Sequence, residues 1–262
     1  MEEVEQIVGW LSNKEKLAAM LAPSFPVVFS YPQIVGKLRR VGFTYVVEVA
    51  VVASWTNDGV IKALKKDDKT RIITAPCPSI VRIIKSTYPH LVKYLAMGVD
   101  SPMVATAKLL DETGINMKKV FIGPCVMKKK EAGEDRKELA ITVITYEELK
   151  KVFEKMGVKD EASDERADFD WRHAKTRLYP ISGGLAQSSE VRKILSTDEI
   201  SVVSGWKNCK PALDGFEESH VRLLDILNCD GGCISGPGIV SDLSLNERRA
   251  RVIKYWERNK VL

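Results

Sequence analysis

Residues 71–88 read RIITAPCPSIVRIIKSTY and contain, in order, a β-branched run, a cysteine between two prolines, and an apolar pattern with helical spacing. β-Branched residues favour strands, and apolar residues that recur every three or four positions mark one face of a helix. The stretch therefore predicts a strand over 71–74, a loop that carries Cys77, and a helix over 80–88. A strand followed directly by a helix is the repeating unit of a parallel sheet.

The same alternation of strand and helix patterns runs along the rest of the chain. Strands are expected at 27–29, 45–49, 71–74, 120–122, 141–145, 178–181, 201–203 and 221–227. Helices are expected over 34–41, 60–64, 80–88, 147–155, 185–195, 207–216 and about 245–260. Such repeated units form mostly parallel sheets whose faces are covered by helices. The predicted fold class is α/β, two-lobed, with mostly parallel sheets flanked by helices.

Size and composition allow a large buried core and argue against a membrane protein. Of the 262 residues, 45% are hydrophobic, which suits one large two-lobed domain or two smaller ones. No uncharged apolar run of about 18 residues occurs, and the first residues are acidic where a secretory leader would be basic. We therefore expect a cytoplasmic protein with no membrane partner.

Charge is mixed along the chain. The 40 basic and 35 acidic residues give a net charge of +5 without a basic arm, so nucleic acid is not an expected partner. A mild attraction to acidic proteins is compatible with this balance. The charged stretch 159–168 has little to bury and is predicted to be a surface loop. The last helix either docks on the body or leads into a further domain.

Four of the five cysteines each lie shortly after a predicted strand. They are Cys77 after 71–74, Cys125 after 120–122, and Cys229 and Cys233 after 221–227. Such strand ends lie at the ligand-binding edge of a parallel sheet, so the four thiols can converge there. Neighbouring glycines let the backbone pass close to a bulky core, and prolines fix the loops. Four thiolates suit an iron–sulfur cluster or a zinc ion.

Two other interpretations of these cysteines compete. Single cysteines are most often ordinary buried thiols, although four in matching positions make that reading weaker. Structural zinc usually draws on two close cysteine pairs, whereas here Cys229 and Cys233 form the one close pair. Cys209 falls within a helical pattern and is predicted to be a structural thiol.

The three cysteine segments resemble signature motifs of the iron-only ([FeFe]) hydrogenases. Residues 74–78, TAPCP, resemble the family's TSCCP, and residues 123–131, GPCVMKKKE, resemble its MPCxxKxxE. Residues 227–238, LNCDGGCISGPG, resemble MACxGGCxxGGG. With weaker matches between them, the likeness spans roughly residues 20–240 in the expected order. It implies a single cluster-binding domain over 1–262, with the cluster in the cleft between two lobes.

The resemblance also implies a cofactor. Cys77, Cys125, Cys229 and Cys233 would hold a 4Fe–4S cluster, and Cys233 would bridge it to a di-iron unit that carries CO, cyanide and a dithiolate. That unit performs the hydrogen chemistry in the family, with H2 and protons as substrates, while the protein supplies orientation and a dry pocket. Cys233 is therefore expected to take part in catalysis.

Four further residues match positions around that cofactor. Lys128 matches a lysine that donates to a cyanide ligand, although it could instead be a solvent-facing member of a basic run. Glu131 would orient Lys128, or be an exposed carboxylate at a helix start. Pro23 and Ser24 would contact the di-iron unit, or form only a turn.

The chain departs from the family pattern where protons and gas would move. Pro76 replaces a cysteine that carries protons in efficient members, and the usual glutamates after residues 50–54 are missing. Gly123 and Leu227 stand where the family has methionines, and Met103 stands where it has glutamine. These departures resemble those of the sensory hydrogenases and predict slow turnover. A ferredoxin-like electron partner or a signalling domain would complete the system.

Three functions remain open at this point. The leading hypothesis is slow reversible H2/proton chemistry used for hydrogen sensing. The second is a non-catalytic 4Fe–4S scaffold or electron-transfer protein that lacks the di-iron unit. The third is an interaction module stabilised by zinc.

Overall fold

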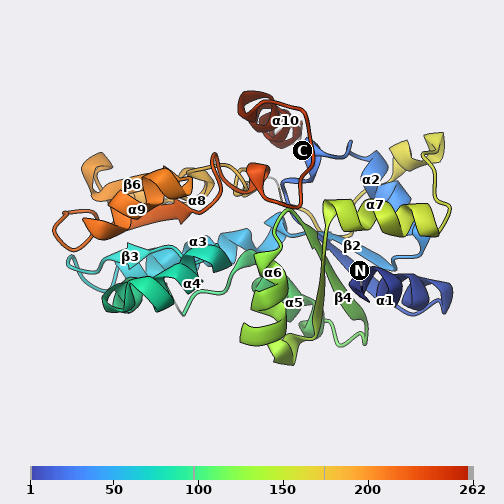
Figure 1. The fold of residues 1–262 in the computed structure, drawn as a ribbon, viewed down its shortest axis with the longest axis horizontal. Helices are drawn as coiled ribbons and strands as arrows, with labels where there is room; N and C mark the ends of the chain where they lie inside the picture. The colour runs from blue at the N-terminus through green and yellow to red at the C-terminus, as the bar shows by residue number, and fades with distance from the viewer. Residues whose placement is uncertain (1, 97, 174, 259–262) are drawn as a thin grey trace.

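The computed structural model describes residues 2–96, 98–173 and 175–258, which form two lobes lying side by side (Figure 1). Each lobe contains a parallel sheet with helices on both of its faces. This arrangement confirms the predicted α/β fold class.

The first lobe is built on a sheet with the strand order β2-β1-β4-β5. Its strands are β1 (Leu17–Leu21), β2 (Tyr45–Glu48), β4 (Lys118–Gly123) and β5 (Ile141–Thr145). The helices α1 (Glu2–Ser12), α2 (Gln33–Val41) and α7 (Tyr146–Lys155) cover one face. The helix α5 (Pro102–Glu112) covers the other face, close to the short α6 (Met127–Lys130).

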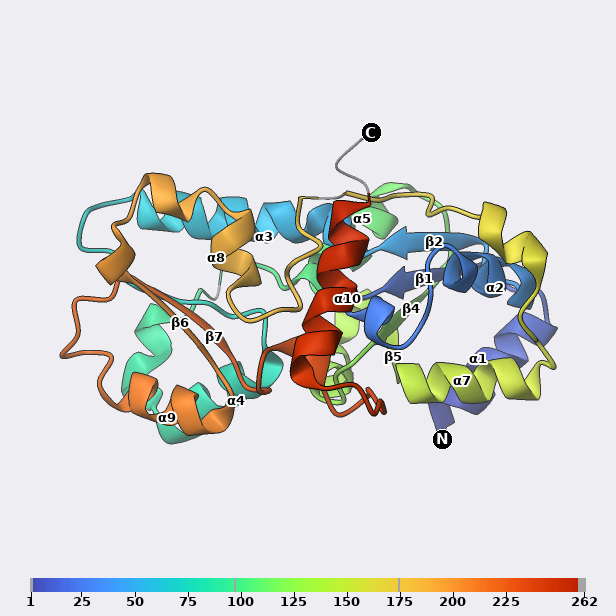
Figure 2. The ribbon, with the colours of Figure 1, turned by 90° about the horizontal axis from the view of Figure 1, so that it is seen from above.

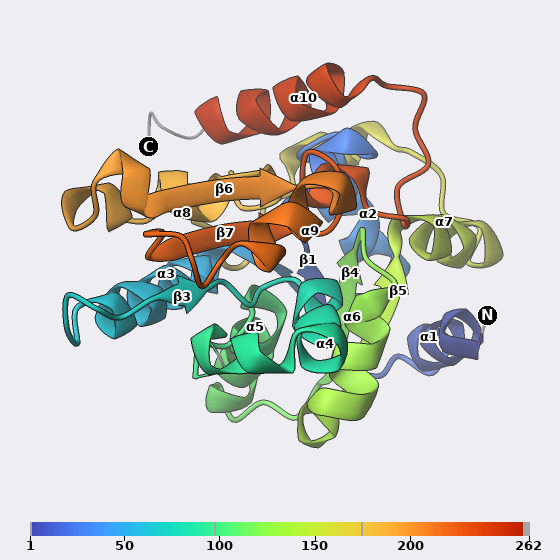
Figure 3. The same cartoon turned by 60° about the vertical axis from the view of Figure 1, so that its left-hand side comes forward.

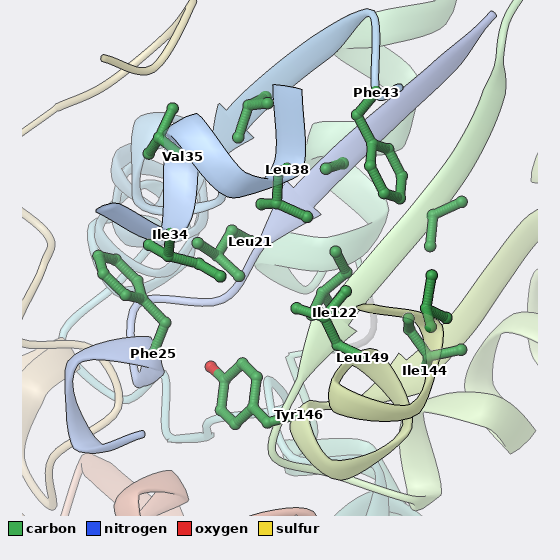
Figure 4. Close-up of a cluster of buried hydrophobic side chains, with 14 of the residues drawn as sticks. Leu21, Phe25, Ile34, Val35, Leu38, Phe43, Ile122, Ile144, Tyr146 and Leu149 are labelled. Atoms are coloured by element: carbon green, nitrogen blue, oxygen red, sulfur yellow. The ribbon is translucent and has the colours of Figure 1, made fainter. Parts of the chain in front are cut away.

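Alternation of side chains along β1 explains how one strand serves two cores. Leu17, Ala19 and Leu21 belong to the core beneath α1, α2 and α7, part of which is drawn in Figure 4. Ala18 and Met20 belong to the core beneath α5. All of these side chains are fully buried, as expected for a central strand whose two faces are both covered.

The second lobe is built on a sheet with the strand order β3-β7-β6, and Figure 3 shows these strands following one another. Its strands are β3 (Ile72–Ile73), β6 (Ile200–Ser204) and β7 (Leu223–Leu227). The helices α4 (Pro78–Thr87) and α9 (Trp206–Asp214) pack on one face. The helices α3 (Ala50–Leu64) and α8 (Gly184–Ser188) pack on the other.

The last helix, α10 (Leu245–Glu257), lies across the junction of the lobes (Figure 2). It begins with a capping box in which Ser244 and Glu247 satisfy each other's backbone N–H groups. Val252 and Tyr255 are buried beneath it against the first lobe. The helix therefore docks on the body, which is one of the two arrangements expected from the sequence.

Short helical turns complete the chain. They are η1 (Phe25–Val27), η2 (Pro89–Tyr94), η3 (Glu131–Asp135), η4 (Lys137–Leu139), η5 (Ala162–Arg166), η6 (Val191–Lys193), η7 (Thr197–Glu199) and η8 (Cys233–Ser235). Among the described residues, no helix has the length and apolar character needed to cross a membrane.

Several predicted elements were wrong. The run at 27–29 is not a strand, because Pro26 at the start of η1 favours a helical turn. The run at 178–181 forms turns with a single bridge from Ile181 to Gly232, since Pro180 cannot donate to a ladder. The predicted helix at 185–195 is broken into α8 and η6.

The charged stretch 159–168 lies mostly on the surface, as predicted, but it is more ordered than a loop with little to bury. It contains η5, and Asp164 within it is only 2% exposed. Arg40 of α2 donates to both Asp164 carboxylate oxygens, at 2.7 and 2.9 Å. This paired, bidentate contact anchors the segment to α2.

Candidate metal centre

The four predicted ligand cysteines lie at strand ends of both lobes. Cys77 precedes α4 in the second lobe, and Cys229 and Cys233 follow β7 there. Cys125 follows β4 in the first lobe. The thiols therefore approach one another across the junction of the two lobes, as the family resemblance implied, and not along the edge of one sheet, as expected from the strand ends alone.

The loop from Cys229 to Cys233 depends on its two glycines. Gly231 and Gly232 have φ angles of 70° and 103°, a region that side chains of L-residues rarely adopt. A Cβ at Gly232 would lie 2.6 Å from the Pro180 carbonyl oxygen. Glycine at this position therefore allows the two cysteines to turn back against the segment at 180–182, whose Ser182 N–H donates to the Gly231 carbonyl.

The four thiols influence one another electrostatically. Burial raises the pKa of the Cys233 thiol well above its ordinary value, and Cys77, Cys125 and Cys229 raise it further. Burial raises the pKa of Cys229 to about 11, with added contributions from Cys77 and Cys125. The four groups are thus close enough for their thiolates to repel. A cationic core set between them would relieve that repulsion.

No three His, Cys, Asp or Glu side chains within the described ranges form a group able to hold one metal ion. A single zinc ion would require such a group, with sulfurs about 2.3 Å from the metal. The geometry therefore offers no direct support for the zinc alternative.

A cavity of about 80 Å³ adjoins two of the cysteines. Its lining comes from both lobes: Ala22, Pro23, Ser24, Val49, Ala53, Pro76, Pro102, Met103, Phe121, Pro124, Cys125, Lys128, Tyr179, Pro180, Leu227 and Cys233. Most of these side chains are apolar, as is usual for a site that excludes water. Pro23, Ser24 and Lys128, which were predicted to contact a cofactor, all lie in this wall; Glu131 does not.

Lys128 is buried, and its ammonium group is fully engaged. The Nζ donates to the Pro76 carbonyl oxygen at 3.2 Å, to the Ser101 hydroxyl at 3.1 Å, and to the Glu131 carboxylate. Glu131 therefore holds the lysine, as the sequence suggested. The charge of Lys128 lowers the pKa of the Cys125 thiol, although burial dominates and the net shift of that pKa is upward.

The neighbouring Lys129 behaves as a surface residue. It pairs with Glu3 at 3.1 Å and with Glu148 at 2.6 Å, away from the cavity. Lys130 is exposed. Of the basic run, Lys128 is thus the member that faces the site.

Ser24 is fully buried and hydrogen-bonds to a residue that the sequence did not single out. Its Oγ lies 2.7 Å from the Tyr146 hydroxyl oxygen, and Tyr146 donates to the Ala22 carbonyl at 3.0 Å. Burial raises the pKa of Tyr146, and proximity to Cys233 raises it further. Tyr146 therefore holds Ala22 and Ser24, two residues of the cavity wall, in place.

The departures from the family motifs map onto the same cavity. Pro76, Met103 and Leu227 all line it. At Gly123, a Cβ would lie 2.6 Å from Cε1 of Phe121, so the Phe121 ring fills space next to this glycine. Phe121 is itself part of the cavity wall.

Two further buried polar groups near the site were missed. The Tyr179 hydroxyl donates to Asn57 at 2.9 Å, and Tyr179 lines the cavity. Asp225, in the middle of β7, accepts from the Ala186 N–H at 3.1 Å, and burial raises its pKa to about 6. A polar residue in an apolar strand was the available signal for Asp225. Nothing local in the sequence marks Tyr179.

Cys209 is fully buried in the core of the second lobe, as predicted for a structural thiol. Its Sγ donates to the Leu227 carbonyl oxygen at 3.4 Å. Burial raises its pKa to about 11, with smaller contributions from Cys77 and Cys229.

Two parallel sheets with a cysteine-lined, mostly apolar cavity between them define a hydrogenase-like domain. Residues 15–237 match the family described as iron only hydrogenase large subunit, C-terminal domain, and the chain belongs to that family. The predicted resemblance is therefore confirmed.

A curated relative is the cytosolic Fe-S cluster assembly factor NAR1 of Encephalitozoon cuniculi. It is 26% identical over 215 residues, which are 72% of this chain and 56% of that protein. The chain thus spans little more than half the length of this relative.

Solved structures of [FeFe]-hydrogenases share the fold. A variant of HydA1 from Chlamydomonas reinhardtii superposes with a TM-score of 0.70 at 18% identity, covering 95% of this chain and 88% of that one. HydA(deltaEFG), from a study of stepwise H-cluster assembly, gives 0.69 with the same identity and coverage. Identity this low establishes the fold alone.

Proposed function

We propose that Cys77, Cys125, Cys229 and Cys233 hold a 4Fe–4S cluster and that the adjoining cavity accommodates a di-iron unit bridged through Cys233. The observation that carries this proposal is the mostly apolar cavity beside Cys125 and Cys233, with Lys128 in its wall. A cubane alone needs four thiolates and no such space. A second inorganic unit with small neutral and anionic ligands suits an apolar wall that contains one buried cation.

When bound, the di-iron unit supplies the reversible interconversion of dihydrogen with protons and electrons. The chain's own part is to hold and shield it. Lys128, fixed by Pro76, Ser101 and Glu131, presents a positive charge beside the thiolates. Prolines 23, 76 and 102 stiffen the wall and offer no proton.

The missing proton donor supports slow chemistry suited to sensing. Pro76 has no titratable group at the position where an efficient hydrogenase needs one. A sensor needs only to register H2, whereas an enzyme of metabolism needs rapid proton delivery. We propose a cytoplasmic hydrogen sensor that exchanges electrons with a ferredoxin-like protein or reports to a signalling domain, with the whole of residues 1–262 as one domain.

Infrared spectroscopy tests this function. Protein matured with the di-iron unit is expected to show CO and cyanide stretching bands that change reversibly when H2 replaces argon. The Lys128→Met variant should shift the cyanide bands, because it removes the buried positive charge beside them, while Lys130→Met should leave them in place. Absence of the bands in matured protein would reject the di-iron unit, and bands that ignore H2 would reject sensing.

A second candidate function is a non-catalytic 4Fe–4S scaffold. The observation in its favour is the 26% identity to a protein named as a cytosolic Fe-S cluster assembly factor. This candidate predicts one cubane, no CO or cyanide bands, and transfer of the cluster to an apo-acceptor protein. Matured protein that shows those bands and retains its cluster in the presence of the acceptor would reject it.

A further inference from the structure

A groove of about 530 Å³ lies between α10 and the chain that follows η1. Aromatic rings of Phe29, Tyr31 and Tyr255 contribute to its lining, together with Pro26 and Pro32. The groove has its own lining, which shares no residue with that of the cofactor cavity. Such a surface can receive the apolar side chains of a peptide.

One side of this α10 groove is strongly cationic. Arg251, Lys254 and Arg258 line it, and their spacing of three and four places them on one face of the helix. In the described part of the chain none of the three forms an ion pair with a carboxylate. Arg251 and Arg258 instead donate to the carbonyls of Val27 and Tyr31, at 3.3 and 3.2 Å, which holds them at the rim.

Acidic groups in the lining do not balance these charges. Glu165 is the carboxylate found there, and it accepts a long hydrogen bond of 3.4 Å from Gln33. Guanidinium and ammonium groups with unused donors favour carboxylates, with which arginine forms paired hydrogen bonds. The groove thus combines an excess of positive charge with an aromatic lining.

Tyr255 connects the groove with the cofactor cavity. Its ring lines the groove, and its hydroxyl donates to Glu48 at 2.9 Å. Arg177 closes the same buried cluster by donating to both Glu48 oxygens, at 2.6 and 2.7 Å. Residue 49, next to Glu48, lines the cofactor cavity.

A second contact joins Tyr255 to the wall of the cofactor cavity, through Phe25. The Phe25 and Tyr255 rings lie 4.9 Å apart, edge to face, and Phe25 follows Ser24 of the cavity wall. At the other end of the helix, Arg248 donates at 3.4 Å to the carbonyl of Ile234, which follows Cys233. A displacement of α10 would therefore move the segments around Glu48, Phe25 and Ile234, each of which adjoins a residue of the cofactor cavity.

We propose that the α10 groove docks an acidic segment of a partner protein, and that Tyr255 couples its occupancy to the walls of the cofactor cavity. The coupling rests on the proposed function, whereas the docking does not. Because binding linkage is reciprocal, a segment that shifts the cofactor's environment must also bind differently when the cofactor changes state.

The docking is tested with a fluorescein-labelled peptide that carries several glutamates around one tryptophan, followed by fluorescence anisotropy. Wild-type protein is expected to bind it more weakly as salt is raised, because salt screens the attraction. Arg251→Glu with Lys254→Glu should weaken binding by at least about tenfold. The matched control, Arg249→Glu with Lys207→Glu, makes the same charge change outside the groove lining and should bind as wild type does.

Three results would overturn the docking. They are no binding to wild type, equal loss in the control variant, and equal binding of a peptide with glutamines in place of the glutamates. Circular dichroism of each variant checks that the overall helix content is unchanged. None of these readouts requires the di-iron unit, so failure of the proposed function leaves them interpretable.

The coupling is tested on cluster-loaded protein by electron paramagnetic resonance of the reduced cluster. Saturating peptide is expected to change the wild-type line shape and to have a smaller effect in Tyr255→Phe, which keeps the ring but loses the bond to Glu48. Peptide that binds without changing the wild-type spectrum would overturn the coupling, as would an unchanged response in Tyr255→Phe.

Discussion

In the wall of the cavity, the ring of Phe121 occupies the space that a side chain at Gly123 would need. Positions 121 and 123 lie on the same face of β4, and a Cβ at Gly123 would lie 2.6 Å from the Phe121 ring. Gly123→Ala is therefore expected to destabilise the protein by about 1–3 kcal/mol through overpacking. Urea denaturation measures the change in the free energy of unfolding.

The same substitution in a Phe121→Leu background provides the control. The smaller side chain leaves room for the new methyl group, so the added cost of Gly123→Ala should fall by about half or more. Equal costs in both backgrounds would show that the ring is not what demands glycine.

Lys128 is expected to raise the reduction potential of the bound cluster. Reduction adds negative charge close to this buried ammonium, so Lys128→Met should lower the midpoint potential by about 60 mV, one tenfold change for one electron. A redox titration followed by electron paramagnetic resonance gives the value. The exposed Lys130→Met serves as control, and equal potentials in the two variants would contradict this role.

Asp225 gives the protein a predictable pH dependence. Burial raises its pKa to about 6, above the value of about 3.9 in an unfolded chain. The folded state therefore binds the proton more tightly, so this group's contribution to stability is full below pH 4 and is lost as pH rises through 6.

Asp225→Asn removes this titration. The difference in unfolding free energy between wild type and variant should change by about 1.4 kcal/mol between pH 5 and pH 8, with wild type relatively weaker at pH 8. Urea denaturation at the two pH values measures it. A difference that does not vary with pH would mean that the carboxyl is not held in its neutral form by burial.

At the scale of elements, the buried cluster of Glu48, Arg177 and Tyr255 joins β2, the segment before Tyr179, and α10. Arg177→Met would leave the Glu48 carboxylate buried without its cation, which costs about 3–5 kcal/mol. The double variant with Glu48→Gln should recover much of that loss, because no charge is left unpaired. Thermal denaturation compares the variants, and a double variant no better than the single one would contradict the explanation.

Local sequence was enough to predict elements whose residues prefer the structure they adopt. Residues 71–88 form β3, the Cys77 loop and α4 as expected. The strand β1 could not be predicted, because its LAAML sequence lacks β-branched residues. Its conformation is set by pairing with β2 on one side and β4 on the other.

The candidate site likewise contains features that could be predicted from the sequence and features that could not. Cysteines beside glycine and proline after strands were visible in the sequence, as was the Lys128 motif. The Ser24–Tyr146 and Asn57–Tyr179 contacts each join residues 122 positions apart, so no local sequence pattern predicts them. Strand ends alone did not predict the split of the cysteines between two sheets, because strand order is a property of the whole fold, whereas the family resemblance did imply a cleft between two lobes.

At the scale of the whole molecule, each lobe supplies part of the centre. The first lobe provides Cys125, Lys128 and Ser24, and the second provides the other three cysteines. Binding of a cluster should therefore stabilise the contact between the lobes, and loss of the cluster should destabilise the junction beneath α10.

The most direct test is Mössbauer spectroscopy of iron-reconstituted protein with single Cys→Ser variants. We expect a 4Fe–4S spectrum in wild type and in Cys209→Ser, and its loss or conversion in Cys77→Ser, Cys125→Ser, Cys229→Ser and Cys233→Ser. Cys125→Ser is the decisive variant, because it alone removes the ligand of the first lobe. If Cys125→Ser gives the same spectrum as wild type, Cys125 is not a ligand and the cluster does not join the two lobes.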